Sequence, residues 1–358
     1  MGAAGGTLGE YTRNQLSSLH DVVGTAGGDS AQLLGELLGT AAGRSLAEPP
    51  GWPSDIADDS TPVEFSIAFN DNGERHLRIL GETSPGTGSH TDHRNAERLL
   101  EKIAGARGLP LDRFRAIRDL FLPADSGALF ALWFSFIFRP DTPPDLKVYL
   151  NPAARGPEHD RGSVAEGLSR LGLAGAYRTI EQHALRREQD RCAFFALDIS
   201  AEPRARVKVY IAHEAGTAED AVAAAAAVPG ADAAQVRRFC EITGGGTEVF
   251  DGRPLVSSYA FSHGDTAVPS NYSIYVPLRS YVSDDAEARD RVAAAMAERG
   301  TDPGVVDEAL RAIAERPLEA GPGLLAHTSL RLGGSHSGVT TYLSSEAYQR
   351  PSAQRRVA

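Results

Sequence analysis

The spacing of apolar positions along the chain alternates between two periods. Apolar and polar residues that alternate strictly, with Gly, Pro, Asn or Asp between the runs, predict antiparallel hairpins. Five such hairpins are predicted, at about residues 62–80, 129–150, 192–211, 255–278 and 324–344. Their nearly even spacing indicates an internal repeat.

Segments with helical periodicity, usually two, lie between consecutive hairpins. They are 96–106 with 111–121, 163–173 with 177–189, 218–228 with 232–242, and 285–300 with 303–316. Two more, 11–23 and 30–42, precede the first hairpin. Helix, strand, strand and helix therefore occur together five times.

Ten consecutive antiparallel strands have no exposed edges if they close into a barrel. We therefore expect an α+β protein: a ten-stranded antiparallel β-barrel of five αββα repeats, surrounded by helices, with room inside for a ligand. An open sheet or two half-sheets are the alternatives. Residues 1–358 are expected to form a single domain, within which the proline-rich stretch 48–55 is a connection.

The composition indicates a globular protein with an acidic surface. Hydrophobic residues make up 42% of the chain and charged residues 23%, and the net charge is -11. This charge argues against nucleic acid or an anionic membrane as the main partner, so any cationic site must be local. Cys192 and Cys240 are too few for a disulfide framework or a zinc site, and no run of apolar residues is long enough to cross a membrane. A cytoplasmic location is predicted.

Lysine is rare in this chain and recurs in one motif. Of 36 basic residues only three are lysines, and two of them, Lys147 and Lys208, lie in the near copies LKVYL and RVKVYI. Coincidence is one interpretation; the other is that a compact ammonium group is required at both places.

Alternation along these strands places the polar residues of the motif on one face. The apolar face must meet the helices, so the basic and tyrosine face is left for the interior. The expected inward set is Arg78, Lys147, Arg206 and Lys208 with Tyr149, Tyr210, Tyr275 and Tyr342.

Cations that are enclosed together repel one another unless an anion joins them, so the set favours a multiply charged anion such as diphosphate. Tyrosine faces attract cations. Together they suit a reaction that separates an anion from a carbocation. The alternative is that these residues form solvated strand faces, with tyrosine present only because it favours strands.

The motifs LKVYLNP, RVKVYI and SIYVPL, with EFSIAF and LRILGE in the first hairpin, resemble the aromatic prenyltransferases of the dimethylallyltryptophan synthase family. The resemblance covers most of the chain, whose length is closer to the bacterial members than to the fungal ones. It implies the ABBA fold, in which five αββα units close a ten-stranded barrel.

The resemblance also implies roles for individual residues. Glu64 would accept the indole N–H and act in catalysis with Lys208. Some fungal members carry glutamine where this chain has Ser273, which puts one diphosphate contact in doubt. Prenyl diphosphate would be bound by Arg78, Lys147, Arg206, Lys208 and, as a further candidate, Arg331, and the allyl cation would be shielded by Tyr149, Tyr210, Tyr275 and Tyr342.

The implied function is transfer of a dimethylallyl group from dimethylallyl diphosphate to an indole ring, most simply that of tryptophan or a derivative. The alternatives are another aromatic acceptor, such as tyrosine or a hydroxynaphthalene, and a non-catalytic barrel that binds an anionic small molecule. Since no DDxxD run is present, no cofactor is expected and Mg²⁺ is not obligatory. His90 and His93 have no evident third ligand and are expected to lie in a solvated loop.

Overall fold

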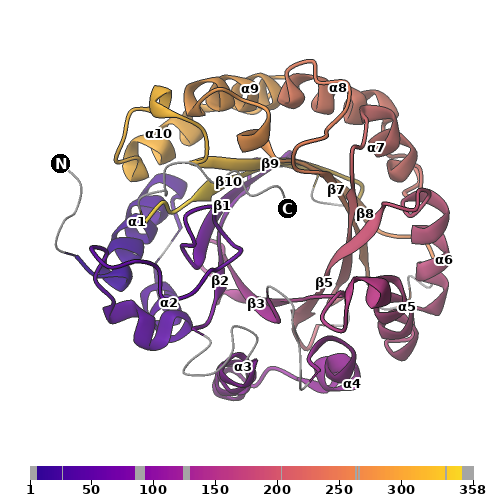
Figure 1. Cartoon of the computed structure of the whole chain (residues 1–358), viewed down its shortest axis with the longest axis horizontal. Coiled ribbons are helices and arrows are strands. Elements are labelled where there is room, and N and C mark those ends of the chain that lie inside the picture. Colours follow the sequence, from indigo (N-terminus) through magenta and orange to yellow (C-terminus); the bar gives the residue numbers. More distant parts are fainter. Residues whose placement is uncertain are drawn as a thin grey trace.

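The strands predicted from the sequence close on themselves. The computed structural model describes residues 6–25, 27–84, 93–123, 130–202, 204–262, 264, 267–334 and 337–348. Each strand pairs antiparallel with its neighbours in sequence, and the last strand pairs with the first. Figure 1 looks into this closed barrel. The predicted barrel of five αββα repeats is confirmed, and the open-sheet alternatives are wrong.

The ten strands follow the predicted hairpins closely. They are β1 (Val63–Asn70), β2 (Arg75–Glu82), β3 (Leu132–Phe138), β4 (Asp145–Leu150), β5 (Arg191–Ile199), β6 (Val207–His213), β7 (Leu255–Phe261), β8 (Asn271–Val276), β9 (Leu325–Leu332) and β10 (Gly338–Ser344).

Two helices precede each hairpin. They are α1 (Leu8–Val23), α2 (Ser30–Leu38), α3 (Arg94–Arg107), α4 (Asp112–Phe121), α5 (Asp160–Arg170), α6 (Ala174–His183), α7 (Ala218–Ala225), α8 (Ala233–Gly244), α9 (Asp285–Ala297) and α10 (Gly304–Ile313). Short 3-10 helices are η1 (Gly39–Gly43), η2 (Pro157–His159), η3 (Leu278–Ser280) and η4 (Leu318–Ala320).

Several helices end earlier than predicted, and the difference is largest for the helix predicted at residues 177–189. Helical periodicity extends to residue 189, but α6 ends at His183. The following turn is held instead by Asp190, whose carboxylate accepts hydrogen bonds from the backbone N–H and the guanidinium of Arg187. Such a side-chain hydrogen bond competes with the helical hydrogen bonds of the backbone. Because it does not alter the spacing of apolar residues, periodicity does not predict it.

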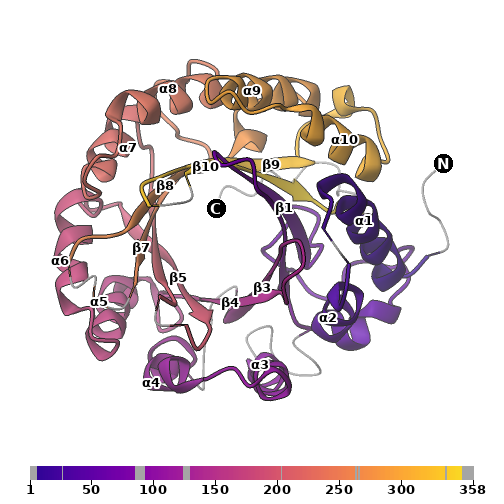
Figure 2. The same ribbon diagram turned by 180° about the vertical axis from the view of Figure 1, so that it is seen from behind.

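The hydrophobic core lies between the barrel and the ring of helices, which surrounds the strands in both views (Figures 1 and 2). Outward strand residues such as Val148, Val209 and Ile274 are fully buried there. Gly81 on β2 lets α2 approach closely, because a Cβ at this position would lie 2.1 Å from Leu37 Cδ2. Packing against the helices thus explains why the outward face of the strands is apolar.

Two β-bulges interrupt the regular pairing. One lies between Cys192 and Phe194 on β5, and the other on β9, where Ala326 lies between the partners of Tyr342 and Leu343. Bulges bend a strand and increase its twist, which helps a sheet to close. Beyond the bulge on β5, Phe194 pairs with inward-facing Tyr210.

Candidate active site

The inward side chains differ from the outward ones in their exposure. Tyr149, Tyr275 and Tyr342 on the inner face keep intermediate exposure, whereas their outward neighbours Val148 and Ile274 have none. Side chains inside a closed barrel reach solvent only if the interior has room for it. The inner face is therefore accessible to small molecules.

The predicted cations that lie in strands come together on this inner face, each beside a small residue of a neighbouring strand. Since serine and alanine fill little space, the charged groups are free to project inward. The cross-strand pairs are Arg78 with Ser66, Lys147 with Ser135, Lys208 with Ala196, and Arg331 with Ser273. Arg331 thus lies with the other cations.

Asp198 was missed by the sequence analysis. Its carboxylate lies 3.1 Å from Lys147 Nζ and 2.7 Å from Arg206 Nε. Burial opposes its ionisation, but Lys147 and Arg206 hold its pKa well below the usual range. The protein itself therefore supplies one carboxylate among these cations, which the sequence analysis did not include. Strict alternation from Phe194 and Ala196 would have placed Asp198 on the inner face.

The remaining cations are less well compensated. Within the described residues, Lys208 and Arg78 form no ion pair, and the buried Arg78 Nε has no hydrogen-bond acceptor. The Lys208 ammonium lies 5.2 Å from the ring centre of Tyr210. Buried donors without acceptors are costly, so this part of the barrel is prepared for an anion.

Both inward lysines hold their protons weakly. Burial lowers the pKa of Lys147 to about 7, with Arg206 and Lys208 adding to the effect and Asp198 opposing it. Burial and the nearby Arg206 and Arg331 place the pKa of Lys208 well below its usual value. An arriving anion would reverse both effects.

The four predicted tyrosines form one continuous belt. Ring centres are 5.7 Å apart between Tyr149 and Tyr210, 5.7 Å between Tyr210 and Tyr275, and 5.9 Å between Tyr275 and Tyr342. Burial raises the pKa of Tyr149 to about 12, so its hydroxyl is neutral near pH 7. Strands β4, β6, β8 and β10 thus each contribute one electron-rich ring.

Two buried carboxyl groups lie toward one end of the barrel. Burial raises the pKa of Glu64 to about 8, although Arg279 opposes the shift. Glu82, which the sequence analysis did not assign, accepts a hydrogen bond of 2.8 Å from Ser54, and burial raises its pKa to about 7. Trp133 pairs with Glu82 across β2 and β3 and stacks on Phe130, with ring centres 4.0 Å apart. This end therefore combines carboxyl groups with flat aromatic surfaces.

The remaining sequence motifs have structural explanations. Cys192 and Cys240 are buried and free. Gly245, one of three consecutive glycines at residues 244–246, ends α8 in the left-handed conformation. His90 lies outside the described residues. The expectation of a solvated loop is wrong for His93, which directly precedes α3 with a side chain only 13% exposed and Nε2 3.9 Å from Glu97. In the described ranges, no three His, Cys, Asp or Glu side chains gather as for a metal, and no helix combines the length and apolarity needed to cross a bilayer.

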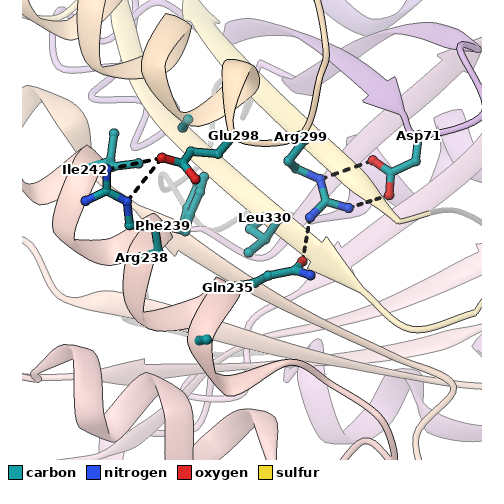
Figure 3. A pocket seen from close by; sticks show the side chains of 10 residues that line it. Asp71, Gln235, Arg238, Phe239, Ile242, Glu298, Arg299 and Leu330 are labelled. Atoms are coloured by element: carbon teal, nitrogen blue, oxygen red, sulfur yellow. Dashed lines mark hydrogen bonds and ion pairs between the residues drawn. The ribbon is translucent and has the colours of Figure 1, made fainter.

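A cavity of about 560 Å³ lies outside the barrel wall, between α8, α9 and β9 (Figure 3). Its charged groups are already paired with one another: Arg238 with Glu298, and Arg299 with Asp71. It shares none of the inward residues described above, so the chemistry of the barrel interior does not extend to it.

The family model described as tryptophan dimethylallyltransferase matches residues 31–308. The chain belongs to this family. The fold, the cation set and the tyrosine belt described above are thus those of a family member.

Three solved structures are similar over nearly their whole length. The 6-dimethylallyltryptophan synthase from Micromonospora olivasterospora, in complex with DMASPP and Trp, is 46% identical with a TM-score of 0.92, covering 96% of this chain and 99% of that one. The 5-dimethylallyl tryptophan synthase from Streptomyces coelicolor is 34% identical with a TM-score of 0.89, covering 98% of each. The apo form of the prenyltransferase PriB is 35% identical with a TM-score of 0.89, covering 96% of this chain and 98% of that one.

Proposed function

We propose that this protein transfers a dimethylallyl group from dimethylallyl diphosphate to the indole ring of tryptophan. The observation that carries the proposal is the adjacency of an incompletely compensated cation set and a tyrosine belt within one closed barrel. Family membership, and similar structures that bind DMASPP and Trp, support the choice of substrates.

The donor diphosphate would be held by the inward cations. Charge-assisted hydrogen bonds to phosphate oxygens are strong, and half-buried Arg78 and buried Lys208 have unused donors for them among the described residues. When the C1–O bond breaks, its electron pair leaves with the diphosphate. The cations then stabilise charge that develops in the transition state, which is the most effective use of fixed electrostatics. Lys147, Arg206 and Arg331 would also bind the diphosphate.

The allyl cation left behind would be shielded by the tyrosine belt. Rings of Tyr149, Tyr210, Tyr275 and Tyr342 follow one another along the inner face, and the Lys208 ammonium lies 5.2 Å from the ring centre of Tyr210. Aromatic faces stabilise a desolvated cation by roughly 1 to 2 kcal/mol each. A closed wall also limits attack by water, so the cation survives until a ring carbon of the acceptor captures it.

The acceptor would be oriented by Glu64. This buried carboxyl group faces the interior from β1, and an indole N–H donor is its natural partner. Accepting that hydrogen bond increases electron density in the ring. After the C–C bond forms, the arenium ion loses a proton and aromaticity returns.

We further infer that no Mg²⁺ is obligatory and that the protein acts in the cytoplasm. Side-chain cations occupy the role that magnesium has where an acidic motif holds diphosphate. Nothing in a purely anion-binding barrel requires a belt of four tyrosines or a buried Glu64. These two features favour the enzyme over a non-catalytic binder.

The test is incubation of the purified protein with L-tryptophan and dimethylallyl diphosphate, with and without EDTA, followed by mass spectrometry. The expected product is tryptophan with one added C5H8 unit in both samples. Absence of product across indoles, tyrosine and hydroxynaphthalenes would reject the enzyme. Product lost only with EDTA would reject the metal-independent mechanism.

A further inference from the structure

A cluster of one carboxylate and two guanidinium groups lies at the barrel end that carries Glu64, and the steps described above do not use it. Asp58 Oδ1 lies 2.5 Å from Arg253 Nη2 and 3.3 Å from Arg279 Nη1. The Arg279 side chain is only 6% exposed, whereas that of Arg253 is 32% exposed. The cluster therefore extends from the protein interior to a solvent-accessible position.

Asp58 belongs to a strap, residues 54–58, that crosses this end of the barrel. Ser54 donates a hydrogen bond to Glu82 on β2, and Ile56 packs in the cluster of Phe130 and Trp133 near β3. Asp58 then reaches Arg253, just before β7, on a different part of the barrel wall. The strap thus brings its carboxylate over the interior.

Arg253 is held in place by the other side of the barrel end. The Tyr281 hydroxyl donates to the carbonyl of Arg253 at 2.6 Å and accepts from the N–H of Gly252 at 3.0 Å. Tyr281 follows η3, which contains Arg279. One hydroxyl therefore fixes the loop of Arg253 beside the segment of Arg279, so both guanidinium groups are positioned before a ligand arrives.

The cluster is close enough to act on the acceptor end. The ionisation of Glu64 depends mainly on burial and then on the charges of Arg279, Asp58 and Arg253. Burial is also the main cause of the lowered pKa of His327, and both arginines lower it further. His327 faces inward on β9, edge-on to Tyr342 with ring centres 6.2 Å apart. An acceptor with its ring at Glu64 would therefore have its side chain near the cluster.

We propose that Asp58, Arg253 and Arg279 bind the α-amino-acid group of the acceptor. The guanidinium groups would donate to its carboxylate, and Asp58 would accept from its ammonium group. A guanidinium has five donors, so the ion pair with Asp58 leaves Arg253 able to bind a second carboxylate. This inference rests on the proposed function and makes the cluster the reason for selecting a free amino acid.

The test compares three acceptors: L-tryptophan, tryptamine without the carboxylate, and indole-3-propionate without the ammonium group. Arg253→Gln should raise KM about 10- to 100-fold for L-tryptophan and indole-3-propionate, and leave that for tryptamine nearly unchanged. Asp58→Asn should instead act on the two acceptors that carry an ammonium group. KM for dimethylallyl diphosphate should not move.

Arg238→Gln is the matched control, because Arg238 also pairs with a carboxylate, Glu298, but lies outside the barrel. It should change none of these constants, and melting temperatures of all variants should be recorded. An equal loss with all three acceptors would show that Arg253 only holds the strap, and an unchanged KM for L-tryptophan would also overturn the proposal.

Failure of the proposed function can be told apart from failure of this site. If the wild-type protein modifies none of the acceptors, calorimetry with L-tryptophan and tryptamine in the presence of dimethylallyl thiolodiphosphate still tests binding. Tighter binding of L-tryptophan that Arg253→Gln removes would support the site. Equal affinity for both compounds would reject it.

Discussion

At the scale of single residues, the two inward lysines are expected to take up protons when an anion binds. Burial lowers the pKa of Lys147 to about 7, so this group is largely neutral at pH 8 in the free protein. A bound diphosphate favours the charged form and raises that pKa, so the complex takes up a proton.

Calorimetry of dimethylallyl thiolodiphosphate binding at pH 8, in two buffers that differ in ionisation enthalpy, measures this uptake. The wild-type protein should take up more protons than Lys147→Met. Lys102→Gln is the control, because Lys102 is 64% exposed and pairs with Glu36 on the surface. Identical uptake by the wild type and Lys147→Met would contradict the account.

Glu64 should give the reaction a pH dependence on the alkaline side of neutrality. Its pKa is raised from 4.5 to about 8 by burial, and only the ionised form is the full acceptor for an indole N–H. With saturating donor, kcat/KM for L-tryptophan should therefore rise as pH rises through about 8. Glu64→Gln should abolish this rise, whereas Glu82→Gln should retain it. A rise that persists in Glu64→Gln would assign it to another group.

The residue scale also shows what strand alternation could and could not predict. The predicted inward residues that lie in strands, from Glu64 to Arg331, share the inner face, because apolar neighbours fix the opposite face against the helices. Asp198 was missed because β5 contains a bulge and a nearly continuous apolar run, which hides its polarity pattern.

At the scale of elements, close packing of α2 on β2 depends on the absence of a Cβ atom at Gly81. A Cβ at Gly81 would lie 2.1 Å from Leu37 Cδ2, so Gly81→Ala must displace this buried side chain. The expected loss is about 1 to 3 kcal/mol of unfolding free energy. Gly105→Ala in α3, where a Cβ meets nothing within 4 Å, should instead stabilise by up to about 1 kcal/mol.

Urea unfolding of both variants provides the comparison. If Gly81→Ala unfolds at the wild-type urea concentration, the helix and strand are not packed as described. The strap of residues 54–58, by contrast, had no periodicity from which to predict it. Its course is set by individual contacts such as Asp58 with Arg253, which are 195 residues apart in sequence.

At the scale of the whole molecule, repetition made the fold predictable. Five similar units in one chain leave few arrangements that remove all sheet edges, and the observed barrel is the simplest. That residues 1–358 form a single domain stays a prediction. The contacts of the barrel end depend on side chains from segments far apart in sequence, and no local pattern encodes such proximity.

The central claim is that side-chain cations inside the barrel drive departure of diphosphate from the donor. Its most direct measurement is the rate of tryptophan dimethylallylation in EDTA by the wild-type protein and by Lys208→Ala, with melting temperatures recorded for both. We expect turnover by the wild type, and a rate at least about 100-fold lower for Lys208→Ala without loss of stability, because a buried ammonium group is removed. Equal rates for the two proteins would contradict the claim.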